Sequence, residues 1–204
     1  MTADSSFGEP HDILRVATYN IHKGVQGVGP TRRLEIHNLA LAIETLDADI
    51  VCLQEVRQGN RKEASYFTGW PEQPQAEFLA PEGYEAVYRS NAVTKHGEHG
   101  NALLSRWPVI ECRHEDMSDH RFEQRGLLHA KLLVAGVTLH AIVVHFGLIP
   151  SSRVRQTARL KAYIAREIPL DEPVVVAGDF NDWGTRVRRL LRVDSLHAFE
   201  GPRT

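Results

Sequence analysis

The sequence predicts an α/β protein whose strands are joined in two different ways. The first residues read as strand, helix and strand in turn, which is typical of two parallel strands joined by a crossover helix. The stretch 127–146 instead reads as two strands around Ala135 and Gly136, the best hairpin signal in the chain. Because both connections occur, we expect a mixed sheet, or two packed sheets with helices outside, rather than a purely doubly wound sheet.

Composition limits what such a chain can be. Its 204 residues, 42% hydrophobic and 25% charged, suffice for one sizeable core and are few for two, so residues 1–204 are expected to form one domain. The net charge of −2 gives no overall attraction to nucleic acid or anionic membranes, so a polyanionic partner needs a local patch. The polar start is no signal peptide, and no apolar run reaches the roughly 18 residues of a membrane span. These features predict a soluble, cytoplasmic protein, and they leave its oligomeric state open.

The first part of the chain supplies the strand, helix and strand unit. Residues 13–21 form a β-branched and aromatic run that stops at a glycine-rich loop, which predicts a strand. From 32 to 46 the apolar residues recur at steps of three and four, which predicts an amphipathic helix, and 49–56 returns to a strand. The polar segment 57–82 then reads as a long excursion.

The second part adds further strands and one long helix. Strands are expected at 83–90 and 101–110, with a turn-rich link between them, and 111–124 is mostly charged. After the hairpin, residues 152–168 have the period of a helix and are rich in arginine. A buried strand follows at 174–178.

Polar side chains follow four of the apolar strands at the point where each strand ends. These residues are Asn20, Glu55, His145, and Asp179 with Asn181. If the strands lie side by side, their ends bring carboxylates, amides and an imidazole to one edge, where α/β sheets usually hold their sites. Each residue alone also has a structural reading, as a turn cap, a rim residue or a hydrogen-bonded histidine. The repeated placement favours a functional site.

The residue types favour one chemistry. Oxygen ligands without thiols suit Mg²⁺ or Mn²⁺, and Mg²⁺ typically takes one or two carboxylates together with waters and phosphate oxygens. A carboxylate beside such a metal can orient or deprotonate water, while amides and a histidine can hold phosphate oxygens. This set of groups predicts hydrolysis of a phosphate ester.

The motifs "ATYNIHKG", "DIVCLQEV", "GNALLSRWPV", "VVHFGL" and "VVVAGDFND" occur in the order and spacing of a known superfamily. The chain resembles the endonuclease/exonuclease/phosphatase superfamily, metal-dependent hydrolases related to DNase I, exonuclease III and neutral sphingomyelinases. The resemblance covers essentially the whole chain. It implies a four-layer sandwich of two mixed sheets flanked by helices, and a substrate among nucleic acids, phospholipid headgroups or other phosphate esters.

The resemblance also implies roles for individual residues. Glu55 would be the principal ligand of Mg²⁺ or Mn²⁺, and Asn20 would join it at the metal or hold the phosphate. Asp179 would position the attacking water, Asn181 would bind the phosphoryl oxygens, and His145 would act near the leaving group.

Three further residues are implied to bind substrate or support the site. They are His22 in "YNIH", Asn101 in "GNALLSR", and Arg125, which would anchor either the phosphate or the structure.

The chain departs from the resemblance at its end, because family members close with an "SDH"-like motif whose aspartate and histidine complete the site. This sequence stops at "HAFEGPRT", and the pair Asp119-His120 precedes "GDFN", so by position it is not that motif. We therefore expect the last strands to be missing, either because the chain is a fragment, because another chain supplies them, or because the product is impaired. A non-catalytic binding or scaffold protein on the same fold is the alternative function.

Two other features have weaker functional readings. The histidines of "HGEHG", His96 and His99, fit no zinc-binding helix and are expected to be solvated loop residues. The arginines of 152–168 and of "RVRRLLR" (186–192) could contact a phosphodiester backbone, but such runs are usually the wet face of a helix. We expect the segments 57–82 and 111–124 to determine the choice of substrate.

Overall fold

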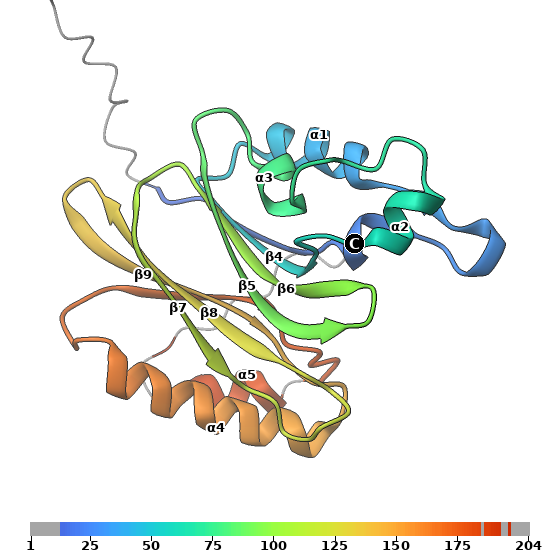
Figure 1. Ribbon diagram of the computed structural model, residues 1–204. Coiled ribbons are helices and arrows are strands. Elements are labelled where there is room, and N and C mark those ends of the chain that lie inside the picture. Colours follow the sequence, from blue (N-terminus) through green and yellow to red (C-terminus); the bar gives the residue numbers. More distant parts are fainter. Residues whose placement is uncertain (1–12, 185, 193–195, 197–204) are drawn as a thin grey trace, which may run out of the picture.

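The computed structural model describes residues 13–184, 186–192 and 196, and these form two four-stranded sheets packed face to face (Figure 1). Helices cover the outer face of each sheet, so the α/β four-layer sandwich expected from the sequence is confirmed. The polar start and the final stretch 197–204, on which the expectation of missing last strands depends, lie outside the described residues.

The first sheet has the strand order β1, β4, β6, β5, and only β1 and β4 are parallel. The strands are β1 (Val16–Asn20), β4 (Ile50–Val56), β5 (Glu85–Thr94) and β6 (Gly97–Ser105). Helix α1 (Ile36–Leu46) makes the crossover between the parallel pair. Its buried face includes Ile36 and Ile43, each of which contributes about 1.5–3 kcal/mol of burial energy.

The second sheet repeats this plan, with the order β10, β9, β8, β7 and one parallel pair, β9 and β10. The strands are β7 (Val109–Asp116), β8 (Gly126–Val134), β9 (Val137–His145) and β10 (Val174–Asp179). The crossover is helix α4 (Pro150–Glu167), which begins at a proline because the first turn of a helix needs no N–H there.

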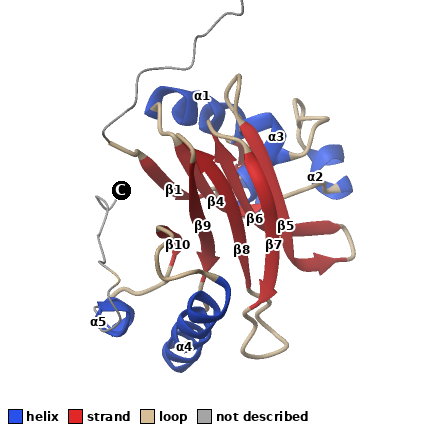
Figure 2. Ribbon diagram, turned by 90° about the vertical axis from the view of Figure 1, so that its left-hand side faces the viewer, coloured by secondary structure: helices blue, strands red, loops and turns tan. Residues whose placement is uncertain are grey.

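The core forms three apolar layers, one between the sheets and one under each set of helices. Helices α1 and α3 (Gln75–Leu79) cover the first sheet, and α4 and α5 (Arg186–Leu191) cover the second (Figure 2). Neighbouring residues of β6 serve different layers, since Leu104 packs under the helices and Leu103 packs between the sheets. Central strands buried on both faces explain the continuous apolar runs in the sequence.

The hairpin predicted around Ala135 and Gly136 is confirmed, since β8 and β9 meet there. Both residues have positive φ, 49° and 83°, as the two-residue turns that match the twist of antiparallel strands require. Within the described residues no helix is both long and apolar enough to span a membrane.

The strand predicted at 101–110 is wrong, because two strands share that range. Strand β6 ends at Ser105 and β7 begins at Val109. Pro108 lies between them, and proline has no N–H to donate to a central ladder. The charged residues that follow, up to Asp116, belong to β7 rather than to a loop.

The polar segments contain more regular structure than the sequence suggested. The glycine-rich loop after β1 includes a small hairpin of β2 (Val25–Gln26) and β3 (Arg33–Leu34), so α1 begins at Ile36 and not at residue 32. The excursion 57–82 contains α3 and another short helix, α2 (Arg61–Tyr66). Strand β5 extends four residues beyond the predicted end at residue 90, to Thr94.

Candidate active site

The functional residues expected at strand ends come together where the two sheets meet. The parallel pair β1 and β4 ends near Asn20 and Glu55, and the parallel pair β9 and β10 ends at His145 and Asp179. The four strands do not form one row, as a single sheet would require, but β1 lies against β10 across the sandwich. The site is therefore built by two sheets, each of which contributes the carboxyl ends of a parallel pair.

Asn20 lies at the centre of this group. Its Nδ2 donates hydrogen bonds to Oε1 of Glu55 and to Oδ2 of Asp179, each over 3.3 Å. Its Oδ1 accepts a hydrogen bond of 3.0 Å from the backbone N–H of His22. One amide thus joins two carboxylates from opposite sheets, and its orientation is fixed by the turn that follows β1.

Glu55 carries a negative charge in a largely buried place. Burial alone would raise its pKa, but the Lys23 ammonium lies 2.8 Å from Oε2 and, with the Asn20 hydrogen bond, lowers the pKa of Glu55 to about 2. The carboxylate is therefore ionised at every physiological pH.

Asp179 is held by the residues that follow β9 and β10. Its Oδ1 accepts a hydrogen bond of 2.9 Å from the backbone N–H of Asn181, and its Oδ2 lies 3.8 Å from Nε2 of His145. The Asn181 side chain donates to the carbonyl oxygen of Phe146 over 2.8 Å, which ties the end of β10 to the end of β9.

His145 is neutral in this environment. Burial lowers its pKa, the positive charge of Arg125 lowers it further, and the carboxylates of Asp179 and Glu55 oppose them, which leaves the pKa of His145 at about 4. At pH 7 the ring can therefore donate or accept a hydrogen bond without adding charge to the site.

Backbone strain is concentrated at the site. Of the six described non-glycine residues with positive φ, four belong to it, namely His22, Lys23, Glu55 and Asn181 with φ between 46° and 64°. L-residues adopt this region only at an energetic cost, so the surrounding structure must hold them there. Such outliers are typical of functional sites.

Arg125 anchors structure next to the site. Its Nε donates to the carbonyl oxygen of Phe146 over 3.2 Å, and a second nitrogen lies 3.0 Å from Oε1 of Glu123. Glu123 in turn accepts a hydrogen bond from the backbone of Leu148. The resemblance implied that Arg125 anchors either the phosphate or the structure, and these contacts match the structural role. The positive charge of Arg125 also lowers the pKa of His145.

Asn101 does not lie where a substrate can reach it. The residue is fully buried in β6, and its Nδ2 donates to the carbonyl oxygens of Gly126 and Val143 over 2.9 and 3.2 Å. These carbonyls belong to β8 and β9 of the other sheet. We therefore assign Asn101 to the joining of the two sheets rather than to substrate binding.

Three residues near the site were not predicted from the sequence to belong to it. Lys23 lies in the glycine-rich loop, and Arg57 directly follows β4. His99 lies in β6 and is half-buried, so the expectation of a solvated loop residue is wrong for His99, whereas His96 is exposed. Burial lowers the pKa of His99, and Lys23 lowers it further while Glu55 opposes both. The glycines around His99 indicated a turn in the sequence. The residues form the start of β6, as their pairing with β5 in the structure shows.

A family model described as the endonuclease/exonuclease/phosphatase family matches residues 17–198. The chain belongs to this family. A relative, the uncharacterized protein YbhP of Escherichia coli (strain K12), is 39% identical over 185 residues, which cover 89% of this chain and 72% of YbhP.

Solved structures of this family share the fold. A family protein from Leptotrichia buccalis has a TM-score of 0.64 at 14% identity, covering 87% of this chain and 73% of that one. A mannosyl-6-phosphatase from Bacteroides thetaiotaomicron has a TM-score of 0.57 at 20% identity, covering 83% and 66% of the two chains. At such identities the likeness concerns the fold alone.

The donor atoms at this family site fit a hard divalent cation. The described residues contain no group of three or more His, Cys, Asp or Glu arranged to hold a metal ion, so a zinc site of the usual kind is absent from them. Carboxylate oxygens of Glu55 and Asp179 lie around the Asn20 amide nitrogen, and the amide oxygen accepts from the His22 backbone. Mg²⁺ takes few protein carboxylates and keeps several waters, which suits this set.

Proposed function

We propose that this family member is a metal-dependent hydrolase of phosphate esters, a phosphodiesterase or phosphatase whose site lies at the ends of β1, β4, β9 and β10. The observation that carries the proposal is the Asn20 amide, which bridges Glu55 and Asp179 although Asp179 is 159 positions away in sequence. Two carboxylates and an amide held together across two sheets suit the binding of Mg²⁺ or Mn²⁺.

Each residue of the site has a separate role in the proposed hydrolysis. Glu55 and Asn20 would hold Mg²⁺ or Mn²⁺, which supplies a Lewis acid for a phosphoryl oxygen when bound. Asp179 orients the attacking water and accepts its proton, and the Asn181 backbone N–H keeps the carboxylate in position for this. The second hydrogen of the Asn181 amide is available for a phosphoryl oxygen as negative charge develops.

His145 contributes a hydrogen bond rather than a proton at neutral pH. Its pKa of about 4, set by burial and by Arg125, keeps the ring neutral. A neutral imidazole can donate a hydrogen bond to the oxygen of the leaving group. Because the ring carries no charge, it does not form an ion pair with the Glu55 or Asp179 carboxylate. His22 is exposed at the turn after β1, where it can contact the part of the substrate outside the site.

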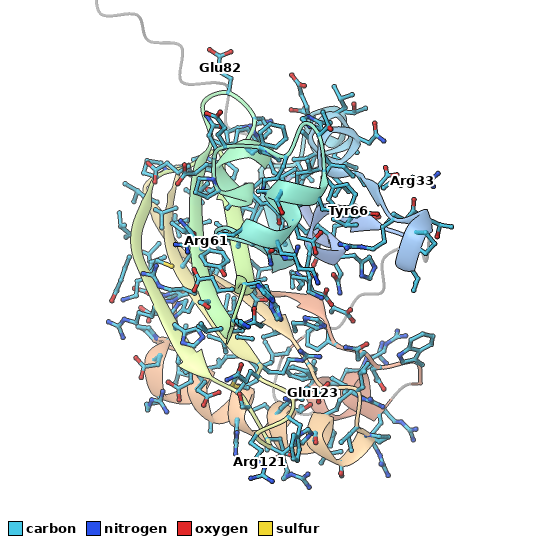
Figure 3. The ribbon with its side chains drawn as sticks, turned by 45° about the vertical axis from the view of Figure 1, so that its right-hand side comes forward. Arg33, Arg61, Tyr66, Glu82, Arg121 and Glu123 are labelled. Atoms are coloured by element: carbon cyan, nitrogen blue, oxygen red, sulfur yellow. The ribbon has the colours of Figure 1, made fainter. Side chains whose placement is uncertain are left out.

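The nature of the substrate is open among nucleic acids, phospholipid headgroups and small phosphate esters. Figure 3 shows Arg33 and Tyr66 on the half of the molecule that carries the helices of the first sheet, and Arg121 and Glu123 of the β7–β8 loop on the half that carries α4. We propose that these segments, within 57–82 and 111–124 and the β2–β3 hairpin, choose the substrate.

Hydrolysis of bis-p-nitrophenyl phosphate tests the proposal. Turnover is expected with Mg²⁺ or Mn²⁺ and not in excess EDTA. Glu55→Gln and Asp179→Asn should each lower kcat/KM by about 10²-fold or more, because each removes a charged group that contacts the reacting atoms. Glu44→Gln and Asp171→Asn are matched controls at exposed positions outside these segments.

The results of this assay distinguish the phosphate-ester hydrolase from the non-catalytic alternative. Equal losses in the site variants and the controls, or metal-independent turnover, would contradict the assigned roles. Absence of turnover with either metal, together with absence of metal binding by calorimetry, would favour the non-catalytic binding or scaffold protein.

A further inference from the structure

Basic side chains gather around Glu55. Lys23 contacts the Glu55 carboxylate directly. Arg57 follows Glu55 by two residues, and His99 comes from the neighbouring strand β6. Burial and the charges of Lys23, Arg57 and Arg125 lower the pKa of His99, so its ring is neutral at pH 7. We call Lys23, Arg57 and His99 the cationic half of the site, because Lys23 and Arg57 carry positive charge.

Arg57 is the unusual member of the cationic half, because its charge is buried without a full set of partners. Its side chain is only 12% exposed, and one terminal nitrogen of the guanidinium is buried without a hydrogen bond. The nearest carboxylate, on Glu63, lies 3.5 Å from that nitrogen. Glu63 is shared between two arginines, because its other oxygen binds Arg32 over 2.6 Å. Buried donors in folded proteins normally have hydrogen-bond partners, so the unsatisfied nitrogen of Arg57 marks a place where a water or an anion can bind.

The backbone of the cationic half is held in place by Gln75 and by the pairing of β4 with β6. Gln75 is buried, and its side chain accepts a hydrogen bond of 2.9 Å from the backbone N–H of Arg57 while it donates one of 2.8 Å to the carbonyl oxygen of Lys23. On the other side, Val56 pairs with Gly100 across β4 and β6, which brings His99 beside Arg57. The positions of these groups are therefore set before any ligand binds, as in preorganised binding sites.

We propose that Arg57, together with His99 and Lys23, forms a second anion subsite beside the hydrolytic centre. The substrate then carries a second anionic group, a phosphate or a carboxylate, next to the phosphate that is cleaved. As a statement about substrate this rests on the proposed function, whereas the anion subsite itself can be tested without turnover. Arginine suits this role because its planar fork can donate two parallel hydrogen bonds to a phosphate.

Calorimetric titration of inorganic pyrophosphate and inorganic phosphate, in metal-free buffer with EDTA, tests the subsite. The wild-type protein is expected to bind pyrophosphate at least tenfold more tightly than phosphate. Arg57→Gln should weaken pyrophosphate binding roughly tenfold, the effect of about 1.4 kcal/mol for one lost charge-assisted contact. Arg15→Gln, which removes an exposed arginine just before β1, is the matched control and should bind as the wild type does.

Several results would overturn the subsite. These are no pyrophosphate binding by the wild type, unchanged binding by Arg57→Gln, or the same loss in Arg15→Gln. If Arg57→Gln does not fold, His99→Gln replaces it, since it leaves the Glu63 ion pairs intact and should weaken pyrophosphate binding several-fold. Thermal unfolding of each variant shows whether it is folded.

A matched pair of chromogenic esters connects the subsite to catalysis. Thymidine 5′-(p-nitrophenyl phosphate) is compared with the same compound carrying a 3′-phosphate. The extra phosphate should lower KM for the wild type, and Arg57→Gln should remove that advantage. Hydrolysis without any effect of the 3′-phosphate or of Arg57 would refute the inferred substrate class and leave the hydrolase proposal standing. No hydrolysis of either ester would instead count against the hydrolase, and the calorimetry would still decide the subsite.

Discussion

Acid should destabilise this protein through one buried histidine on the side of the second sheet that faces α4. His129 is 1% exposed, with Nδ1 2.9 Å from the Tyr163 hydroxyl and Nε2 2.8 Å from Nδ1 of His140. His140 in turn contacts Glu172 through its other nitrogen. Burial, followed by the neighbouring His140, lowers the pKa of His129 from 6.5 to about 4. Protonation of this ring therefore lowers the stability of the folded protein.

The sign and size of the effect follow from the two pKa values. Between pH 6.5 and about 4 the unfolded chain binds a proton at His129 and the folded chain does not. The free energy of unfolding is therefore greatest above pH 6.5 and falls as the pH drops toward 4. Since a tenfold difference in proton affinity corresponds to about 1.4 kcal/mol, the whole loss is ~3 kcal/mol.

Urea unfolding at a series of pH values from 7.5 to 4.5 measures this loss. The variant His129→Gln keeps a polar group next to Tyr163 but cannot take up the proton, so its stability should fall by about 2 kcal/mol less than the wild type over this range. His96→Gln, at an exposed position, should match the wild type. Histidines that do not contact His129, such as His145, contribute equally to all three proteins, so the comparison isolates His129 together with its contact to His140. An unchanged pH slope in His129→Gln would refute the reasoning.

Two further substitutions test the architecture. Asn101→Val removes both side-chain hydrogen bonds that join the sheets and leaves two buried carbonyls without that donor, so urea unfolding should show a loss of about 2–4 kcal/mol; a loss below ~0.5 kcal/mol would contradict the joining role. Gly178→Ala should be worse, because φ is 151° and the added Cβ would lie 1.9 Å from the backbone oxygen of Val144; a thermal midpoint equal to that of the wild type would show that β9 and β10 do not approach each other as described.

The strand ends were predictable because their signal is local. Asn20, Glu55, His145 and Asp179 each follow an apolar run, and a parallel pair of strands must end at the same edge of its sheet. The hairpin at Ala135 and Gly136 was equally local. The residues alone left open whether the four strands share one sheet or divide between two, and only the resemblance implied two sheets, since strand pairing depends on which partner each strand finds far along the chain.

The cationic half of the site was hidden for a related reason. The glycines around His99 indicated a turn, but they serve close packing of strands. A Cβ at Gly97 would lie 2.2 Å from the oxygen of Gly59, and one at Gly100 would lie 1.9 Å from that of Arg89. Such contacts depend on tertiary structure and leave no periodicity in the sequence. The burial of Asn101 was equally unpredictable. An asparagine within an apolar strand has the same local sequence whether its side chain contacts a substrate or a neighbouring sheet.

The span between Asn20 and Asp179 has a consequence during synthesis of the chain. The two residues leave the ribosome 159 positions apart, which at 5–20 residues per second corresponds to about 10–30 s. Once β4 has been made, the growing chain can pair β1 with β4 and place Glu55 beside Asn20, but it still lacks the carboxylate of Asp179. The nascent polypeptide therefore exists for most of its synthesis without a complete centre, and the centre is assembled only when β10 docks beside β9.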